Sequence, residues 1–165
     1  MRDVLADAYS ALRGVTPLGA LDCGMLCGAR CCKGSDGEGM ELFHGEEALF
    51  AGDPDFTVRE ADGRKLLICG GHCRRQHRPL ACRMYPFFPM PYEKDGVTKI
   101  RAVYDVRGWA SCPIVRRQLP GDPRFLRAVR MAGLYLIRDA ENERILKETA
   151  SLFEDLVSFT QTINK

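Results

Sequence analysis

Eight cysteines are the residues in this sequence whose type and spacing could do chemistry. The first cluster places four thiols within ten residues in the pattern C-x3-C-x3-C-C, and a second cluster repeats the spacing of four. The eight are Cys23, Cys27, Cys31, Cys32, Cys69, Cys73, Cys82 and Cys112. Clustered thiols form disulfides, make a reactive thiol centre or bind metal. Four thiolates suit a tetrahedral zinc site, so eight could fill two such sites, or one iron–sulfur cluster and one zinc site.

The adjacent pair Cys31 and Cys32 indicates more than one metal. Neighbouring side chains diverge by about 100° on a helix and point to opposite faces of a strand. The pair can hardly chelate one ion, but it can serve two neighbouring ions or share one that bridges. The first cluster then supplies at most three ligands to a site, so each site also needs later cysteines. We therefore predict that segments 23–32 and 69–82 are held together by shared metals and are not two independent fingers.

Other polar residues near the clusters have weaker claims. His72 and His77 are alternative zinc ligands, although eight cysteines already suffice, and His44 is expected on the surface. A lone cysteine such as Cys112 can equally be a small buried hydrophobe. Six cations fall within or beside the clusters, where they either stabilise thiolates or are ordinary surface residues. They are Arg30, Lys33, Arg74, Arg75, Arg78 and Arg83.

Composition places the chain among globular proteins. Its 165 residues suit one domain, with 45% hydrophobic and 28% charged residues. A formal net charge of +2 gives no electrostatic reason to expect nucleic acid or an anionic membrane as a partner. No stretch reaches the roughly 20 apolar residues of a spanning helix, and the N-terminus lacks the apolar run of a signal peptide. We expect a cytoplasmic protein, in which clustered cysteines bind metal or do redox chemistry more often than they form disulfides.

The pattern of apolar residues predicts an α+β fold, with short strands in the middle of the chain and helices at both ends. A helix is predicted over residues 2–13, and the glycine-rich first cluster is predicted as a loop with one turn of helix. Short strands are expected over 40–43, 56–60, 64–69 and 99–104, with a short helix around 46–51. Pro86, Pro89 and Pro91 predict an extended loop before the last strand. The aromatic and apolar residues around these prolines are expected to line the core.

The last third of the chain predicts two helices. Asp122 before Pro123 is an N-cap followed by proline at the first helical position. One helix over 123–163 would be roughly 60 Å long, too long for a domain of this size, so we expect a break near 139–142. We expect both helices to pack on the cysteine-rich half. The chain is thus predicted as a single domain, 1–165, with a metal-binding region over about 20–115 and a helical pair over 122–163.

Four stretches resemble the bacterial YkgJ-type family: DCGMLCGARCC, CGGHC, HRPLACRMYPF and a late CP. That family is described as a zinc- or iron-chelating domain with the signature C-x2-C-x2-C-C, whereas three residues separate the first cysteines here. Its Arg-Pro-x-x-Cys-Arg-x-Tyr/Phe-Pro stretch is matched by Arg78, Pro79, Cys82, Arg83, Tyr85 and Pro86. The resemblance covers roughly residues 20–115 and implies metal binding. Related sequences include flagellin lysine methylases, so it also suggests methyl transfer by analogy.

These observations leave three hypotheses. The first is a cysteine-ligated metal-binding protein with zinc, which is redox-inert, or alternatively iron or an iron–sulfur cluster. The second is an iron or iron–sulfur enzyme that modifies a protein side chain and keeps an open coordination position. The third is an interaction module whose zinc only shapes a docking surface. Motifs of common hydrolases and nucleotide- or dinucleotide-binding proteins are absent. The partners expected are metal ions and an unidentified protein partner or substrate.

Overall fold

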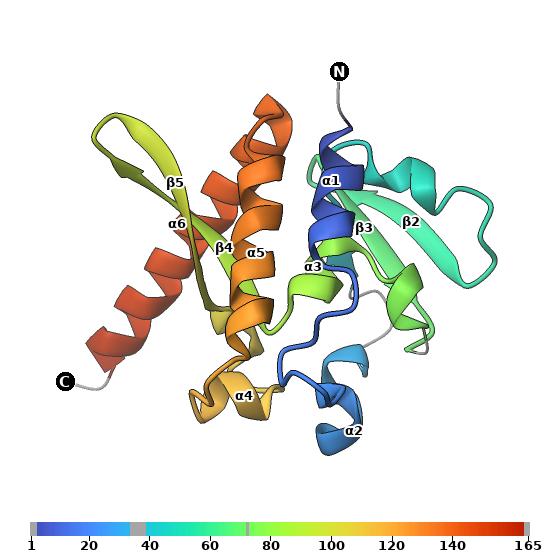
Figure 1. Ribbon diagram of the computed structural model, residues 1–165, viewed down its shortest axis with the longest axis horizontal. Coiled ribbons are helices and arrows are strands. Elements are labelled where there is room, and N and C mark those ends of the chain that lie inside the picture. The colour runs from blue at the N-terminus through green and yellow to red at the C-terminus, as the bar shows by residue number, and fades with distance from the viewer. Residues whose placement is uncertain (1–2, 34–38, 72, 164–165) are drawn as a thin grey trace.

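The computed structural model describes residues 3–33, 39–71 and 73–163, and it confirms the α+β class (Figure 1). Two antiparallel sheets are present, one of three strands in the order β1-β3-β2 and one of two strands, β4-β5. The elements in chain order are α1 (Val4–Ala11), α2 (Cys23–Cys27), η1 (Arg30–Cys32), β1 (Met40–Glu41), η2 (Glu46–Leu49), β2 (Phe56–Ala61), β3 (Arg64–Cys69), η3 (Arg75–His77), α3 (Leu80–Met84), β4 (Phe87–Lys94), β5 (Val97–Tyr104), η4 (Val106–Gly108), α4 (Pro113–Arg116), α5 (Pro123–Leu136) and α6 (Ala140–Ile163).

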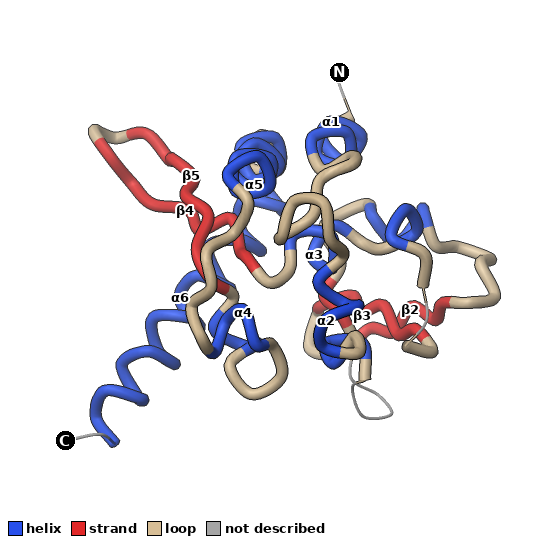
Figure 2. The backbone as a smooth tube through the Cα atoms, turned by 60° about the horizontal axis from the view of Figure 1, so that its bottom comes forward, coloured by secondary structure: helices blue, strands red, loops and turns tan. Residues whose placement is uncertain are grey.

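The main core lies where α1, α5 and α6 meet the β4-β5 hairpin. Helix α5 packs on α1 and on both strands, and Figure 2 shows α1 and α5 side by side. Phe125, Val129 and Leu136 of α5 are buried there together with Leu146 of α6. A smaller cluster, built on Leu42, Phe50 and Leu67, lies under the three-stranded sheet. Cys112 belongs to the main core, and Cys23 packs against it.

The two predicted C-terminal helices and the break between them are confirmed. The Asp122 carboxylate accepts hydrogen bonds from the N–H groups of Arg124 (2.8 Å) and Phe125 (3.2 Å), and Pro123 begins α5. Asp139 caps α6 in the same way through the N–H of Asn142 (3.0 Å). The helices pack chiefly on the β4-β5 hairpin and α1, rather than on the cysteine loops. No helix in the described ranges combines the length and apolar character needed to cross a membrane.

The predicted proline-rich loop is wrong, because that segment is the eight-residue strand β4. It pairs with β5 only, in a register that places Pro89 opposite Ala102 and Pro91 opposite Ile100. Two prolines separated by one residue direct their nitrogen atoms to the same edge of the strand. A strand with one free edge can therefore keep both, since the missing N–H groups lie away from the ladder. Burial of Phe87, Phe88 and Met90, which the sequence predicts as core residues, stabilises the strand.

The remaining predictions differ from the structure in detail. The expected strand over 40–43 is the two-residue β1, and the expected helix over 46–51 is the 3-10 turn η2. Strand β3 ends at Cys69, as predicted, with Cys69 paired to Phe56 of β2. The expected helix over 2–13 is α1, for which Asp3 is the N-cap residue.

Candidate metal centre

The first cysteine cluster folds into one helical turn followed by a 3-10 turn. The Asp22 carboxylate caps α2 by accepting the N–H of Gly24 (3.1 Å). Gly28 ends the helix with φ +64°, a left-handed conformation that glycine adopts at low cost. The spacing of four puts Cys23 and Cys27 on one face of α2. The chain then reverses, and η1 carries Cys31 and Cys32.

The second cluster approaches the first directly. Strand β3 delivers Cys69 into a turn at Gly71, which has φ +78°. A side chain at Gly71 would place its Cβ 2.8 Å from the carbonyl oxygen of Cys32, so only glycine allows this approach. Cys73 follows the turn and Cys82 lies in α3, so the segments 23–32 and 69–82 lie against each other.

Neighbouring thiols raise the pKa of four cysteines, Cys23, Cys31, Cys73 and Cys82, and from these neighbours we group the eight cysteines into two sets of four. The strongest influence on Cys31 comes from Cys32, across the boundary between the sets. Set one contains Cys23, Cys27, Cys31 and Cys112, and set two contains Cys32, Cys69, Cys73 and Cys82. The sets adjoin at one point, because the Sγ atoms of Cys31 and Cys32 are 4.0 Å apart. Their side chains are expected to diverge, but the two sulfurs are in contact. The assignment of Cys31 to set one and Cys32 to set two therefore rests on their other neighbours, Cys23 and Cys27 for Cys31 and Cys73 and Cys82 for Cys32.

Set one surrounds the turn made by α2 and η1. Burial, together with the negative charges of Asp22, Cys112 and Cys27, raises the pKa of Cys23 to about 11. The hydrogen bond with Cys32 raises the pKa of Cys31, as do burial and the charges of Cys32, Cys23 and Cys27. Cys112 is almost fully buried, whereas Cys31 is exposed. Set one thus extends from the core to the surface.

Set two is gathered around α3. Burial raises the pKa of Cys82, and the negative charges of Cys73, Cys32 and Cys69 act in the same direction. Burial also raises the pKa of Cys73, against a hydrogen bond and the charge of Arg78, which lower it. Crowded thiols hold their protons because each thiolate formed would repel the next.

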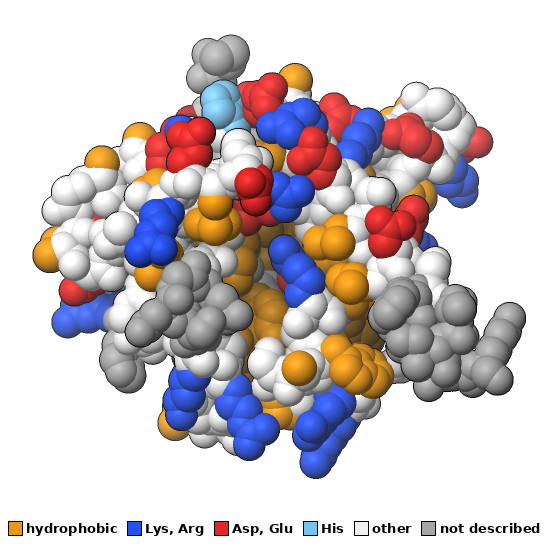
Figure 3. Space-filling view, turned by 180° about the vertical axis from the view of Figure 1, so that it is seen from behind, with side chains coloured by type: hydrophobic (Ala, Val, Ile, Leu, Met, Phe, Trp, Pro, Cys, Tyr) orange, Lys and Arg blue, Asp and Glu red, His pale blue; other side chains and the backbone are white. Residues whose placement is uncertain are grey.

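Two arginines from the cluster region support these sets. Arg75 donates a hydrogen bond to the carbonyl of Val15 (2.7 Å), and its positive charge acts on Cys23. Arg78 provides the cation beside Cys73. Arg83 instead lies over the ring of Tyr9, 4.4 Å from its centroid. Figure 3 shows Lys and Arg side chains gathered at the end of the molecule that carries α2 and α4.

The two histidines that the structure describes, His44 and His77, belong to neither thiol set. His72 lies outside the described residues. His77 is exposed, and His44 is on the surface beside Asp139, with 3.4 Å between Nδ1 and Oδ1.

None of the eight cysteines is in a disulfide, and their sulfurs do not form closed groups of ligands. Within residues 3–33, 39–71 and 73–163, no three Cys, His, Asp or Glu side chains are close enough and suitably directed to hold a metal ion. The two sets are therefore groups of neighbouring thiols and not closed coordination shells.

Two features of this region escape the sequence analysis. Asp22 acts both as the cap of α2 and as a negative charge beside Cys23; its position directly before a short glycine-containing helix is the signal that could have identified it. Glu46 is a buried carboxyl that joins α1 to α3, and no spacing in the sequence indicates it. No family model, curated protein or solved structure matches the chain.

Proposed function

We propose that this protein binds two metal ions through its cysteines, in two adjoining four-thiolate sites. Set one would hold one ion and set two the other, with zinc as the metal. Zinc bound by four thiolates is saturated, and it contributes binding energy to folding without supplying a reactive position. A YkgJ-type relationship is part of this proposal, carried by the sequence resemblance alone.

The observation that carries the proposal is the close approach of the two cysteine clusters, which meet where Gly71 lies against the Cys32 carbonyl. A disulfide framework would need bonded pairs of sulfurs, and none of the eight cysteines is in a disulfide. Buried hydrophobic cysteines would be dispersed through the core, yet only Cys112 is buried and the others are half-buried or exposed. Two groups of four that adjoin at Cys31 and Cys32 have the number and type of donors that two tetrahedral sites require.

Electrostatics supports a cation at each set. The pKa of Cys23, Cys31, Cys73 and Cys82 is raised, in each case partly by neighbouring thiolates. A divalent ion removes this repulsion by replacing the protons. The open arrangement requires small movements of the thiols toward an ion, and the segments that carry them are short turns.

Metal analysis of pairs of variants tests which cysteines share an ion. The wild type should contain two equivalents of zinc. Cys31→Ser/Cys112→Ser removes two ligands from set one and should keep about one equivalent. Cys31→Ser/Cys82→Ser removes one ligand from each set and should lose both. Equal metal content in the two double variants would overturn the division into sets, and a folded wild type that binds no metal would overturn the proposal.

Two further measurements complete the test. Visible spectroscopy on protein purified without oxygen distinguishes the metals, since a colourless protein supports zinc and broad absorbance indicates an iron–sulfur cluster. Limited proteolysis of Cys82→Ser examines the shared-metal prediction. If the 23–32 loop keeps both its protection and its full metal load, the two clusters bind metal independently.

A further inference from the structure

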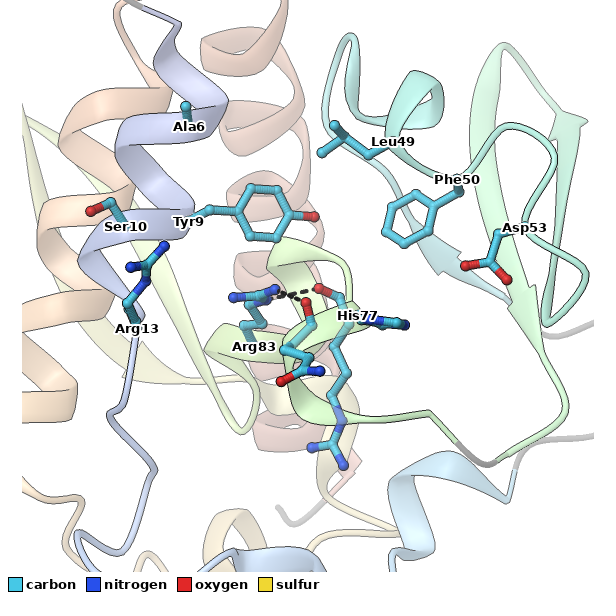
Figure 4. Close-up of a pocket in the computed structure, with 11 residues that line it drawn as sticks. Ala6, Tyr9, Ser10, Arg13, Leu49, Phe50, Asp53, His77 and Arg83 are labelled. Atoms are coloured by element: carbon cyan, nitrogen blue, oxygen red, sulfur yellow. Dashed lines mark hydrogen bonds between the residues drawn. The ribbon is translucent and has the colours of Figure 1, made fainter.

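A pocket of about 480 Å³ lies between α1, η2 and the segment that precedes α3 (Figure 4). Its volume is in the range of small-molecule sites. Tyr9 and Arg13 line it from the α1 side, Leu49 and Phe50 from the η2 side, and Arg83 from α3. None of its lining residues is a cysteine, and it touches the thiol sets only through Arg78, which also hydrogen-bonds Cys73.

The charged side chains that line the pocket are mostly cationic. Arg13, Arg78 and Arg83 line it, against the single carboxylate of Asp53. Three guanidinium groups thus line one pocket. Like charges brought together in this way favour the binding of an anion.

Arg83 is held in place before any ligand arrives. Its Nε donates to the carbonyl of Arg78 (2.9 Å) and another guanidinium nitrogen donates to the carbonyl of Gln76. Its carbon Cζ lies 4.4 Å from the centre of the Tyr9 ring. Arg78 also has a buried Nε atom with no hydrogen-bond partner. A positioned guanidinium favours binding, because little side-chain freedom is lost when it contacts a ligand.

The buried carboxyl of Glu46 lies behind the arginines and does not fully neutralise their charge. Glu46 is buried, and its oxygens accept hydrogen bonds from the Tyr9 hydroxyl and from the N–H groups of Phe43 (3.0 Å) and Leu80 (2.6 Å). Glu46 itself does not line the pocket, and its oxygens are engaged by these three donors. Arg13 and Arg83 are therefore left facing a pocket with Asp53 as the only acidic lining residue.

The wall opposite the arginines is apolar. Figure 4 shows the Tyr9 ring pointing across the pocket toward Leu49 and Phe50. Leu49 is 60% exposed although it is a large aliphatic residue, and Phe50 continues the apolar surface. We propose that this pocket binds a small organic anion, a carboxylate or phosphate attached to a flat apolar group. The anion would lie on Arg13 and Arg83, and the apolar group between Tyr9 and Leu49. This site goes beyond the metal centre and does not depend on it.

The proposal is tested by NMR titration of the amide signals of the intact, metal-analysed chain. Four probes separate the features of the ligand: phenyl phosphate, phenylacetate, inorganic phosphate and benzylamine. Phenyl phosphate or phenylacetate should shift the amides around Arg13, Leu49 and Gln76 at millimolar concentration, and the stronger of the two identifies the acid. Inorganic phosphate should bind about tenfold more weakly because it lacks the apolar group. Tighter binding of benzylamine, or no shift at these amides with either aromatic acid, would overturn the proposal.

Two pairs of variants assign the binding to the pocket. Arg13→Gln should weaken binding of the aromatic acid about tenfold, whereas Arg127→Gln, which removes the same charge from the exposed face of α5, should leave it unchanged. Leu49→Glu places a negative charge opposite the arginines and should abolish binding, while Leu49→Gln should weaken it only a few-fold. Because Leu49 and Arg13 are exposed, these variants are expected to fold. Equal affinities within either pair would refute the site, whatever the metal content.

Discussion

Glu46 offers the most direct test of how the fold supports the candidate site. Its side chain is fully buried (0% exposed) and joins three parts of the chain. It accepts hydrogen bonds from the Tyr9 hydroxyl of α1, from the N–H of Phe43 in its own loop, and from the N–H of Leu80 at the start of α3. Removal of this acceptor should loosen α3, which carries Cys82.

The expected cost follows from the donors left behind. Glu46→Ala leaves the two buried N–H groups without an acceptor, at about 1–3 kcal/mol each, and creates a cavity. The Tyr9 hydroxyl can instead donate to water in the neighbouring pocket, so the loss of its hydrogen bond to Glu46 adds little. We expect Glu46→Ala to lower the free energy of unfolding by about 4 kcal/mol. Glu46→Gln keeps one oxygen acceptor and should cost about 1–2 kcal/mol, and Tyr9→Phe about 1 kcal/mol.

The pH dependence gives this prediction a second readout. Burial raises the pKa of Glu46 above its ordinary value of 4.5, although hydrogen bonds from Tyr9, Leu80 and Phe43 pull it down. The folded protein therefore holds the Glu46 proton more tightly than the unfolded chain. This contribution to stability is complete below pH 4.5 and is lost as pH rises through the folded-state pKa. Glutamine does not titrate, so the stability advantage of the wild type over Glu46→Gln should shrink as pH rises.

Urea denaturation of the wild type and three variants, at matched metal content and several pH values, measures both effects. Tyr9→Phe is the control, because it removes one partner and leaves the buried donors satisfied. A Glu46→Ala protein within about 1 kcal/mol of the wild type would show that the buried N–H groups find other acceptors. A difference between wild type and Glu46→Gln that grows with pH would contradict the raised pKa.

Two further predictions concern the thiol sets. Because the pKa of Cys23 is raised to about 11 and that of Cys82 is also raised, the folded metal-free protein holds these protons more tightly than the unfolded chain. Its urea midpoint, measured with chelator and reductant, should therefore decrease as the pH is raised from 9.0, the ordinary thiol pKa, to 11. A midpoint that stays constant or rises over this range would contradict the prediction. Gly71→Ala should cost about 1–3 kcal/mol, because alanine is strained at φ +78° and its Cβ would meet the Cys32 carbonyl. The control Gly70→Ala has open space at that position, so equal thermal stability of the two variants would argue against close contact of the segments.

The parts of the fold that the sequence predicts are those fixed by neighbouring residues. Asp122 and Pro123 mark the start of α5, and the length of the apolar pattern requires the break that Asp139 caps. Strand β4 could not be predicted, because its prolines contradict a strand until the hairpin register shows which edge is free.

The candidate site, too, could be predicted from the sequence only in part. The adjacency of Cys31 and Cys32 predicts that they serve two neighbouring ions or share one that bridges. The contact between their Sγ atoms, 4.0 Å apart, is not anticipated by that spacing. Which later cysteine joins which set depends on where β3, α3 and α4 lie, and no local pattern encodes that. The pocket is even less accessible to sequence reasoning, because Tyr9, Leu49 and Arg83 come from three segments and have no shared spacing.

Helix α3 links the features described above through a single turn. The N–H of Leu80 binds the buried Glu46 carboxyl, Cys82 belongs to set two, and Arg83 lines the pocket. Successive side chains on a helix diverge by about 100°, so residues 82 and 83 must face different surroundings, thiols on one side and the arginine-lined pocket on the other. A five-residue helix has too few internal hydrogen bonds to be stable alone. Its position therefore depends on Glu46 at one end and on the packing of Met84 at the other, and the same contacts position both Cys82 and Arg83.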